Sequence, residues 1–325
     1  MACTVKYIGN CKNQNIDIST LYRKDVALGT KVVLVCETED ISQYLNDEIT
    51  KVSGAEQVWQ TENNPVLLSC PFDGRMLAIE CAAYLGAGEC QFFIQNDGFY
   101  SADPEELEIA KKLNKIDYDE VLEVCSSGYK ALDGYMIELA KKHSVVIHLL
   151  SYNRPDVPGT VIKEVLGDTG MLIKGVIKDP NITIITLTDI PDRKGISYHI
   201  FKAISDADIV VDIILLPATG TKRDRQDISF TVGKNYKRTA EKVLREKQTE
   251  LGFSDMVIDD NVAKVSVIGA GMQSSFGVAT TLFKVLYEND INLRMINSSE
   301  IKIAVVIDKD QSDLAVHKIH EAFIK

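Results

Sequence analysis

Residues 182–231 and 263–307 carry one pattern twice, and this internal repeat constrains the fold more than any single motif. A shift of 82 positions, the separation of Gly195 and Gly277, also superimposes Phe201-Lys202 on Phe283-Lys284. Each copy alternates period-two apolar runs with helix-length segments, in the order strand, helix, strand, strand, helix. This order predicts βαββαβ units, each a small sheet with two helices on one face. Two units in tandem suggest paired ligand-binding modules, and the alternative is a duplication without a ligand site.

The composition is that of a globular protein of two or three domains. Of the 325 residues, 45% are hydrophobic and 26% are charged. The net charge of −11 disfavours non-specific binding to nucleic acid or to anionic membranes, because both need a basic face. No apolar run reaches membrane-spanning length, and the first residues lack the apolar core of a signal peptide. We therefore expect a cytoplasmic protein.

The cysteines and histidines predict no metal site. All seven cysteines lie in the first 125 residues without a CxxC pair, and most are in apolar runs, so we expect buried free thiols. His317 and His320 should share one face of the last helix. No third ligand is near them, so we expect both to be solvated surface residues.

The segment 153–159, with two prolines and a glycine, marks the expected domain boundary. Before it, apolar strands and helices alternate, which predicts a parallel α/β layer. The expected strands are 31–36, 90–94 and 145–150, and the expected helices are about 75–85 and 134–143.

After this boundary, a lone strand at 172–177 precedes the two repeats, and helices at about 237–250 and 311–323 close them. The expected domains are therefore residues 1–160, a first repeat domain over 165–250 and a second over 251–325.

Several motifs in order resemble the aspartate kinase (aspartokinase) family. In the first part they are Asp97-Gly98-Phe-Tyr100-Ser-Ala-Asp103-Pro104, Gly128-Tyr-Lys130 and Pro158-Gly-Thr160. In the repeats, Ile190-Pro-Asp192-Arg-Lys-Gly195, Lys264-Val-Ser-Val-Ile-Gly-Ala-Gly-Met272 and Ser298-Ser-Glu300-Ile-Lys-Ile303 resemble two ACT domains. The resemblance implies an α/β fold, with a truncated amino-acid-kinase-like parallel sheet layer followed by two ferredoxin-like (βαββαβ) ACT domains.

The family implies transfer of the γ-phosphoryl group of ATP to the side chain of aspartate, the first step of lysine, threonine and methionine biosynthesis. Such kinases hold the phosphates with a Lys-Phe/Tyr-Gly-Gly loop and an Arg-Gly-Gly-Ser-Asp stretch, which supply a cation and close-approaching backbone. Here the first loop can be read only as Lys6-Tyr7-Ile8-Gly9, and the Ile8 side chain would block that approach. The second stretch falls on 70–75 without its pattern. Lys6 and Gly9 are therefore at most a catalytic remnant.

Further departures from the family indicate a lost nucleotide site. Glu105 stands where the family has an arginine, and about 100 residues of a full kinase domain are absent. Asp97, Tyr100, Asp103 and Lys130 remain as a remnant nucleotide half-site. The alternative, which we prefer, is that Asp97 only forms a turn and Asp103-Pro104 only starts a helix. No cofactor is expected unless the kinase is active, in which case ATP and Mg²⁺ are implied.

In ACT pairs of this kind an amino acid binds where a turn leads into the first helix. The N–H groups of a helix N-terminus attract its carboxylate, and a nearby acid or amide holds its ammonium group. The candidate effector-binding residues are Asp192, Gly195, Asp212, Met272, Gln273, Ser274, Gly277, Asn292, Ser298 and Glu300. The alternative is that the glycines serve only as tight turns.

The sequence thus predicts a non-catalytic, regulatory member of the aspartokinase family, a pseudoenzyme that senses lysine or threonine through its ACT domains. We expect a homodimer formed by these domains, with an active aspartate kinase subunit as a second candidate partner and with neither nucleic acid nor membrane. The alternative is an active aspartate kinase that uses an unorthodox phosphate site or a partner subunit. An amino-acid sensor in an unrelated pathway is a third hypothesis.

Overall fold

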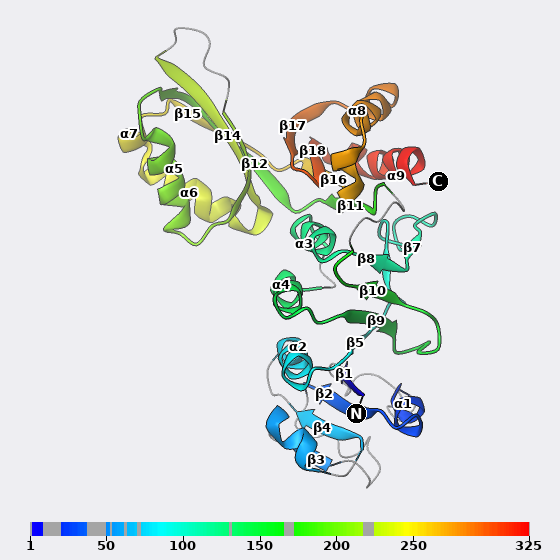
Figure 1. The fold of residues 1–325 in the computed structure, drawn as a ribbon. Helices are drawn as coiled ribbons and strands as arrows, with labels where there is room; N and C mark the ends of the chain where they lie inside the picture. Colours follow the sequence, from blue (N-terminus) through cyan, green and yellow to red (C-terminus); the bar gives the residue numbers. More distant parts are fainter. Residues whose placement is uncertain are drawn as a thin grey trace. The chain divides into compact units, whose positions relative to one another are not determined.

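The computed structural model describes residues 2–8, 21–37, 50–52, 54–61, 64–69, 73–129, 132–165, 172–216 and 224–324. The chain divides into two compact units, residues 1–174 and 175–325 (Figure 1). Within the described ranges, no helix has both the length and the apolar character that crossing a bilayer requires.

In its described residues, the first unit is built on an eight-stranded, mainly parallel sheet. From edge to edge the strands are β3 (Thr50–Val52), β4 (Val66–Ser69), β2 (Lys31–Cys36), β1 (Cys3–Tyr7), β5 (Glu89–Ile94), β9 (Ile147–Ser151), β10 (Thr160–Ile162) and β8 (Lys115–Ile116). Neighbours run parallel except β9 and β10. A small hairpin, β6 (Phe99–Tyr100) and β7 (Lys112–Leu113), lies outside this sheet. Strand β2 is buried throughout, because both faces of a parallel sheet are covered.

Helices cover both faces of this sheet (Figure 1). Helix α1 (Arg23–Ala27) lies on one face, and α2 (Gly74–Leu85), α3 (Tyr118–Ser126) and α4 (Gly134–His143) lie on the other. An aspartate caps each of the last three, and a 3₁₀ turn, η4 (Ala55–Gln60), precedes β4. Helix α2 ends at Gly86 in the left-handed region. The predicted α/β layer is confirmed.

The cysteines of this unit are free where the structure describes them. Cys3, Cys36, Cys81 and Cys90 are buried, and Cys125 is half-buried. The other two, at positions 11 and 70, lie outside the described residues. Burial raises the pKa of Cys3 to about 11 and that of Cys81 to about 12, so these thiols stay protonated near neutral pH.

The second unit contains two four-stranded antiparallel sheets in the residues described. The first has the order β13 (Val211–Leu215), β14 (Arg225–Gly233), β12 (Ile182–Pro191) and β15 (Asp255–Asp259). Helices α5 (Ile196–Ser205), α6 (Lys237–Glu246) and α7 (Gln248–Leu251) pack on it, and η5 (Lys234–Tyr236) leads into α6. Their shared core includes Ile185, Leu187 and Phe230, because alternate residues of a strand face the helices.

The second sheet has the order β11 (Gly175–Asp179), β16 (Val262–Ile268), β18 (Lys302–Asp308) and β17 (Leu293–Ser298). Its helices are α8 (Val278–Glu288) and α9 (Ser312–Phe323), with the short turns η6 (Ala270–Ser274) and η7 (Lys309–Gln311). Each sheet therefore has the strand and helix content of the predicted βαββαβ unit.

The two sheets exchange their edge strands, and this corrects the expected domain boundaries. Strand β11 precedes the first repeat but pairs with β16 of the second sheet. Strand β15 follows residue 250 but pairs with β12 of the first sheet. The divisions at 165–250 and 251–325 are therefore not the divisions between the sheets. An apolar edge strand can complete either sheet, so its position in the sequence does not fix its partner.

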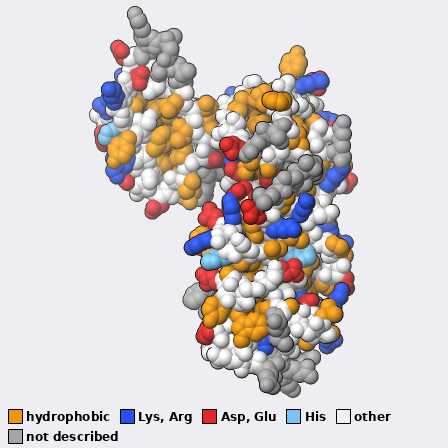
Figure 2. Space-filling view, in the orientation of Figure 1, with side chains coloured by type: hydrophobic (Ala, Val, Ile, Leu, Met, Phe, Trp, Pro, Cys, Tyr) orange, Lys and Arg blue, Asp and Glu red, His pale blue; other side chains and the backbone are white. Residues whose placement is uncertain are grey.

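Charged side chains of both signs are interspersed over the face of the molecule shown in Figure 2. In that view the described surface carries no extended basic patch, in keeping with the net charge of −11.

Candidate functional site

The carboxyl ends of β1 and β2 meet the N-terminus of α2, a place where open α/β sheets bind ligands. Here a carboxylate of the chain itself fills that place. Glu37, directly after β2, accepts hydrogen bonds through Oε1 from the Tyr7 hydroxyl at 2.5 Å and from the Gly74 N–H at 3.3 Å. A Cβ on Gly74 would lie 3.3 Å from Cγ of Glu37 and from Cε2 of Tyr7. The start of α2 is therefore packed against these two side chains.

Asp73 accepts from the next backbone N–H of the same helix, that of Arg75. Its Oδ1 accepts from the Arg75 N–H at 3.0 Å, and its carboxylate pairs with the Arg75 guanidinium at 2.6 Å. These bonds lower the pKa of Asp73, and the same pairing raises the pKa of Arg75 above its ordinary value. The guanidinium at the start of α2 is thus already neutralised.

Lys6 points to the other face of the sheet. Successive side chains of a strand alternate, so Lys6 lies on the α1 face while Tyr7 faces α2. Its Nζ donates to Oε1 of Gln91 at 2.5 Å and pairs with Oδ2 of Asp25 at 2.6 Å. The side chain is 3% exposed, with Nζ 5.6 Å from the centre of the Phe93 ring. Gly9, predicted with Lys6 as a catalytic remnant, lies outside the described residues.

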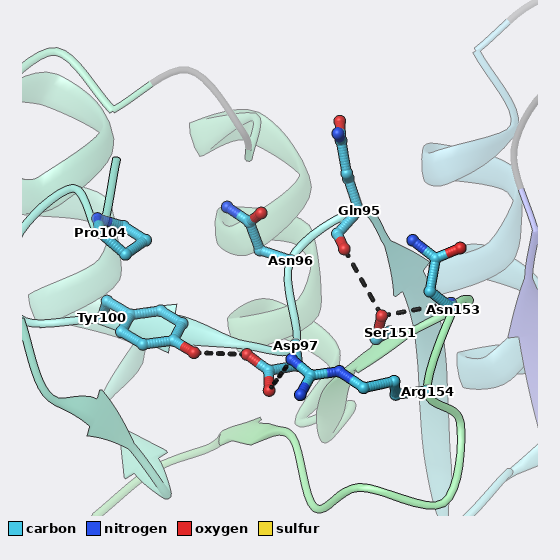
Figure 3. Close-up of a pocket in the computed structure, with 8 residues that line it drawn as sticks. All are labelled: Gln95, Asn96, Asp97, Tyr100, Pro104, Ser151, Asn153 and Arg154. Atoms are coloured by element: carbon cyan, nitrogen blue, oxygen red, sulfur yellow. Dashed lines mark hydrogen bonds and ion pairs between the residues drawn. The ribbon is translucent and has the colours of Figure 1, made fainter. Parts of the chain in front are cut away.

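A cavity of about 220 Å³ lies where β5 and β9 end (Figure 3). Among the described residues that line it, the carboxylate is that of Asp97, whose side chain is 8% exposed. It accepts from the Tyr100 hydroxyl at 2.5 Å and from Nη2 of Arg154 at 2.8 Å, and Lys112 Nζ lies 3.4 Å away. Figure 3 shows Tyr100 and Arg154 approaching Asp97 from opposite sides. The Tyr100 bond, with Lys112 and Arg154, lowers the pKa of Asp97.

The structure brings together only part of the predicted half-site among the residues it describes. Asp103 is exposed and accepts from the Glu105 N–H at 2.9 Å. It opens a single turn rather than the helix we expected, because the backbone bonds that start at Asp103 are not continued. Lys130 lies outside the described residues. Arg154 was missed, because its segment carries only the signals of a domain boundary.

In the second unit, Gly195 and Gly277 occupy equivalent places. Each is the N-cap of a helix, α5 or α8, with φ of 87° and 91°. A Cβ would meet nothing within 4 Å at either position, so the backbone conformation and not lack of space requires glycine. Asp192, before α5, is exposed and accepts from Nε2 of Gln226 at 3.3 Å. Helices α5 and α8 therefore both begin at exposed glycine turns.

Asp212 lies at the opposite end of the first sheet from Asp192, so the chain does not bring these two candidate residues together. Val211 is level with Thr183 on β12, whereas Asp192 follows Pro191. Thr183 and Pro191 are eight residues apart on β12. At roughly 3.3 Å per residue, the two ends of the sheet are about 25 Å apart. Asp212 instead pairs with Nζ of Lys264 on β16, at 2.5 Å.

The candidate effector-binding residues of the second sheet also lie at two opposite ends of their sheet. The backbone N–H of Gly269 donates to the Ile301 carbonyl at 2.9 Å, so η6 lies beside the turn between β17 and β18. Met272, Gly277, Ser298 and Glu300 are therefore at one end of the sheet. Asn292 precedes β17 and lies at the other end. The side chains of Gln273 and Ser274 lie outside the described residues.

The structure describes both histidines that we expected to be solvated, His317 and His320. His320 is fully buried in α9, so the expectation that it is solvated is wrong, whereas His317 is 43% exposed and lies 3.6 Å from Glu321. Within the described parts of the chain, no three His, Cys, Asp or Glu side chains are grouped so that they could hold a metal ion.

Residues 6–151 match the amino acid kinase family, and residues 265–323 match the ACT domain family. The aspartokinase of Mycolicibacterium smegmatis is 32% identical over 318 residues, which cover 97% of this chain and 70% of that protein. The chain belongs to the aspartokinase family. The aspartokinase of Mycobacterium tuberculosis is 32% identical over 296 residues, and the chain spans 66% of its length.

The aspartokinase fold is also found among solved structures. The aspartate kinase of Clostridium acetobutylicum superimposes with a TM-score of 0.82 at 17% identity, covering 99% of this chain and all of that one. Escherichia coli aspartokinase III in complex with aspartate and ADP gives a TM-score of 0.74 at 14% identity, with the same coverage of both chains. At these identities the likeness concerns the fold.

At the start of α2, the described residues do not fit the phosphate groups of the ATP that the aspartokinase family implies. Phosphates need cations and free backbone donors, because their charge must be matched when water is removed. At the start of α2 the Gly74 and Arg75 N–H groups are bound by Glu37 and Asp73, and the Arg75 cation is paired. The Lys6 ammonium is bound on the opposite face.

Proposed function

We propose that this aspartokinase-family chain has lost phosphotransfer and serves as a regulatory protein that binds lysine or threonine through its ACT domains. The observation that carries the proposal is the carboxylate of Glu37 at the N-terminus of α2, 3.3 Å from the Gly74 N–H. A second anion at this position would meet the negative charges of Glu37 and Asp73, and the Arg75 cation beside them is already paired. Phosphoryl transfer depends on charge neutralisation and positioning, and both would fail there.

The ACT turns support the sensing part of the proposal. The helices after Gly195 and Gly277 start at exposed turns, and Asp192 offers an exposed carboxylate beside the first of them. A helix N-terminus attracts a carboxylate, and an aspartate attracts an ammonium group, so the pair suits an α-amino acid. A solved structure with the same fold, Escherichia coli aspartokinase III, is described as a complex with lysine and aspartate, at a TM-score of 0.71 and 15% identity.

The sheet edges support a homodimer. Strand β13 is an edge strand, and it exposes Ile214 and Leu215 at 46% and 38%. Strand β17 is an edge of the second sheet and exposes Ile296 at 41%. Open apolar edges pair with other strands unless they are protected, so a second copy that continues one of these sheets would cover them. An active aspartate kinase subunit is the other candidate partner.

A thermal-shift screen with the twenty amino acids and with ATP and Mg²⁺ tests this function. Lysine or threonine at about 100 times its dissociation constant should stabilise the protein by about 2.7 kcal/mol. The decarboxylated amine should not, because it cannot occupy the helix N-terminus. Asp192→Ala should weaken binding by about 1.5–3 kcal/mol, the value of a charge-assisted hydrogen bond.

Asp310→Ala is the matched control, since Asp310 is an exposed acid of the same unit in η7. It should leave the amino-acid shift unchanged. No shift with any of the twenty amino acids, or an undiminished shift in Asp192→Ala, would contradict the sensing proposal.

A further inference from the structure

We propose that Glu37 is a built-in anion that takes the place of a nucleotide's phosphates at the start of α2. The proposal deepens the loss of phosphotransfer proposed above, because it names the group that closes the site. Glu37 also has a structural role in the kinase-like unit, because its carboxylate is the anion that the N-terminus of α2 and the Tyr7 hydroxyl bind.

The contacts of Glu37 are those of a bound anion. Its Oε1 accepts from a backbone N–H at a helix N-terminus and from a tyrosine hydroxyl, at 3.3 Å and 2.5 Å. Gly74 is buried and allows the carboxylate to approach the backbone, since a Cβ there would lie 3.3 Å from Cγ of Glu37. Helix N-termini favour such an anion because their N–H groups are otherwise unpaired.

Tyr7 holds this carboxylate from the sheet side. Tyr7 is 8% exposed, and its ring packs on Phe92 with the centroids 5.1 Å apart. Burial, together with the bond to Glu37, raises the pKa of Tyr7 well above its ordinary value. The hydroxyl therefore remains a donor at neutral pH, and the ring packing fixes where it points.

The charges around this position explain why phosphate would be excluded. Asp73 adds a second carboxylate at the same helix start, and Arg75 is bound to it through a bidentate contact. Removing the charge of Glu37 would remove the repulsion of an incoming anion, and shortening its side chain would also leave the Gly74 N–H and the Tyr7 hydroxyl as donors facing a vacated position. An external anion could then bind where the side chain had been.

The test measures anion binding by the full chain, without any turnover. Inorganic phosphate and ADP with Mg²⁺ are titrated into the natural protein, Glu37→Gln, Glu37→Ser, Tyr7→Phe and the control Glu80→Gln. Glu80 is exposed on the same helix, away from its N-terminus, so its substitution makes the same charge change elsewhere. Melting curves of each variant show whether it folds cooperatively.

The expected result is that phosphate binds Glu37→Gln at least about tenfold more tightly than it binds the natural protein, a difference of about 1.4 kcal/mol. Glu37→Ser should gain affinity similarly and serves if the glutamine variant does not fold. Glu80→Gln should resemble the natural protein. Tyr7→Phe should not gain phosphate affinity either, because this variant keeps the Glu37 carboxylate.

Three results would overturn the role of Glu37. They are millimolar binding of ADP with Mg²⁺ by the natural protein, no gain of phosphate affinity in a folded Glu37 variant, and an equal gain in Tyr7→Phe. Turnover by the natural protein would instead refute the proposed function, so the two failures can be distinguished.

Discussion

The ion pair between Lys264 and Asp212 should be more sensitive to loss of the aspartate than to loss of the lysine. It joins β16 to β13 across the two ACT sheets, with Nζ and Oδ2 2.5 Å apart. The Lys264 side chain is 3% exposed, whereas that of Asp212 is 37% exposed. Removing one partner of a buried pair costs roughly 3–5 kcal/mol, because the remaining charge stays desolvated. Water can reach Asp212 but not Lys264, so the two substitutions should differ.

Asp212→Asn should therefore lower the free energy of unfolding by about 3 kcal/mol, the low end of the buried-pair range, since Asp212 is partly hydrated. Lys264→Met should cost about 1 kcal/mol or less, because the carboxylate it leaves can be solvated. At about 2–4 °C per kcal/mol, Asp212→Asn should lower Tm by about 6–12 °C and Lys264→Met by at most about 4 °C.

Differential scanning calorimetry without any amino acid measures these shifts. An unchanged Tm in Asp212→Asn, together with loss of stabilisation by lysine or threonine, would refute this reasoning. Asp212 would then contact the effector, as the sequence predicted, and would not be a structural partner of Lys264.

Three further predictions concern the turns, the sheet edge and the pH dependence. Gly195→Ala and Gly277→Ala should each cost about 1–2 kcal/mol of stability from backbone strain alone, and a loss below about 0.5 kcal/mol in urea unfolding would contradict this. Ile214→Lys on the β13 edge should shift a dimer to monomer in light scattering, whereas Val257→Lys on the β15 edge should not; a dimer that persists in Ile214→Lys excludes this edge. Burial raises the pKa of Cys81 from 9.0 to about 12, so its protonated form stabilises the folded state below pH 9. This contribution of Cys81 to stability should be lost between about pH 9 and 12. A Tm that rises over this range would contradict the raised pKa of Cys81.

The repeat made the ACT units predictable from sequence, because its signals are local. Glycines 82 residues apart both adopt positive φ at a helix start, and Asp208 and Asp290 do so at the helix ends, with φ of 56° and 59°. Turn residues of this kind specify backbone conformation within a few positions, and apolar periodicity specifies which face is buried.

The exchange of β11 and β15 could not be predicted in this way. Both strands carry apolar residues that suit either sheet, and the choice depends on which edge the folded chain presents. The same limit applies to the sites. The sequence indicated that the phosphate motif was absent, but not that Glu37 fills its place, since Glu37 and Gly74 are far apart along the chain. Likewise, Arg154 reaches Asp97 only through the tertiary fold.

The most direct test of the account is to trap aspartyl phosphate as its hydroxamate when the full chain is incubated with ATP, Mg²⁺ and aspartate. Kinases turn over at roughly 1–100 per second. The loss of several positioning groups that act as a unit should remove nearly all rate enhancement, so we predict no aspartate-dependent hydroxamate above background. Turnover within about a hundredfold of the usual range for kinases would contradict the account.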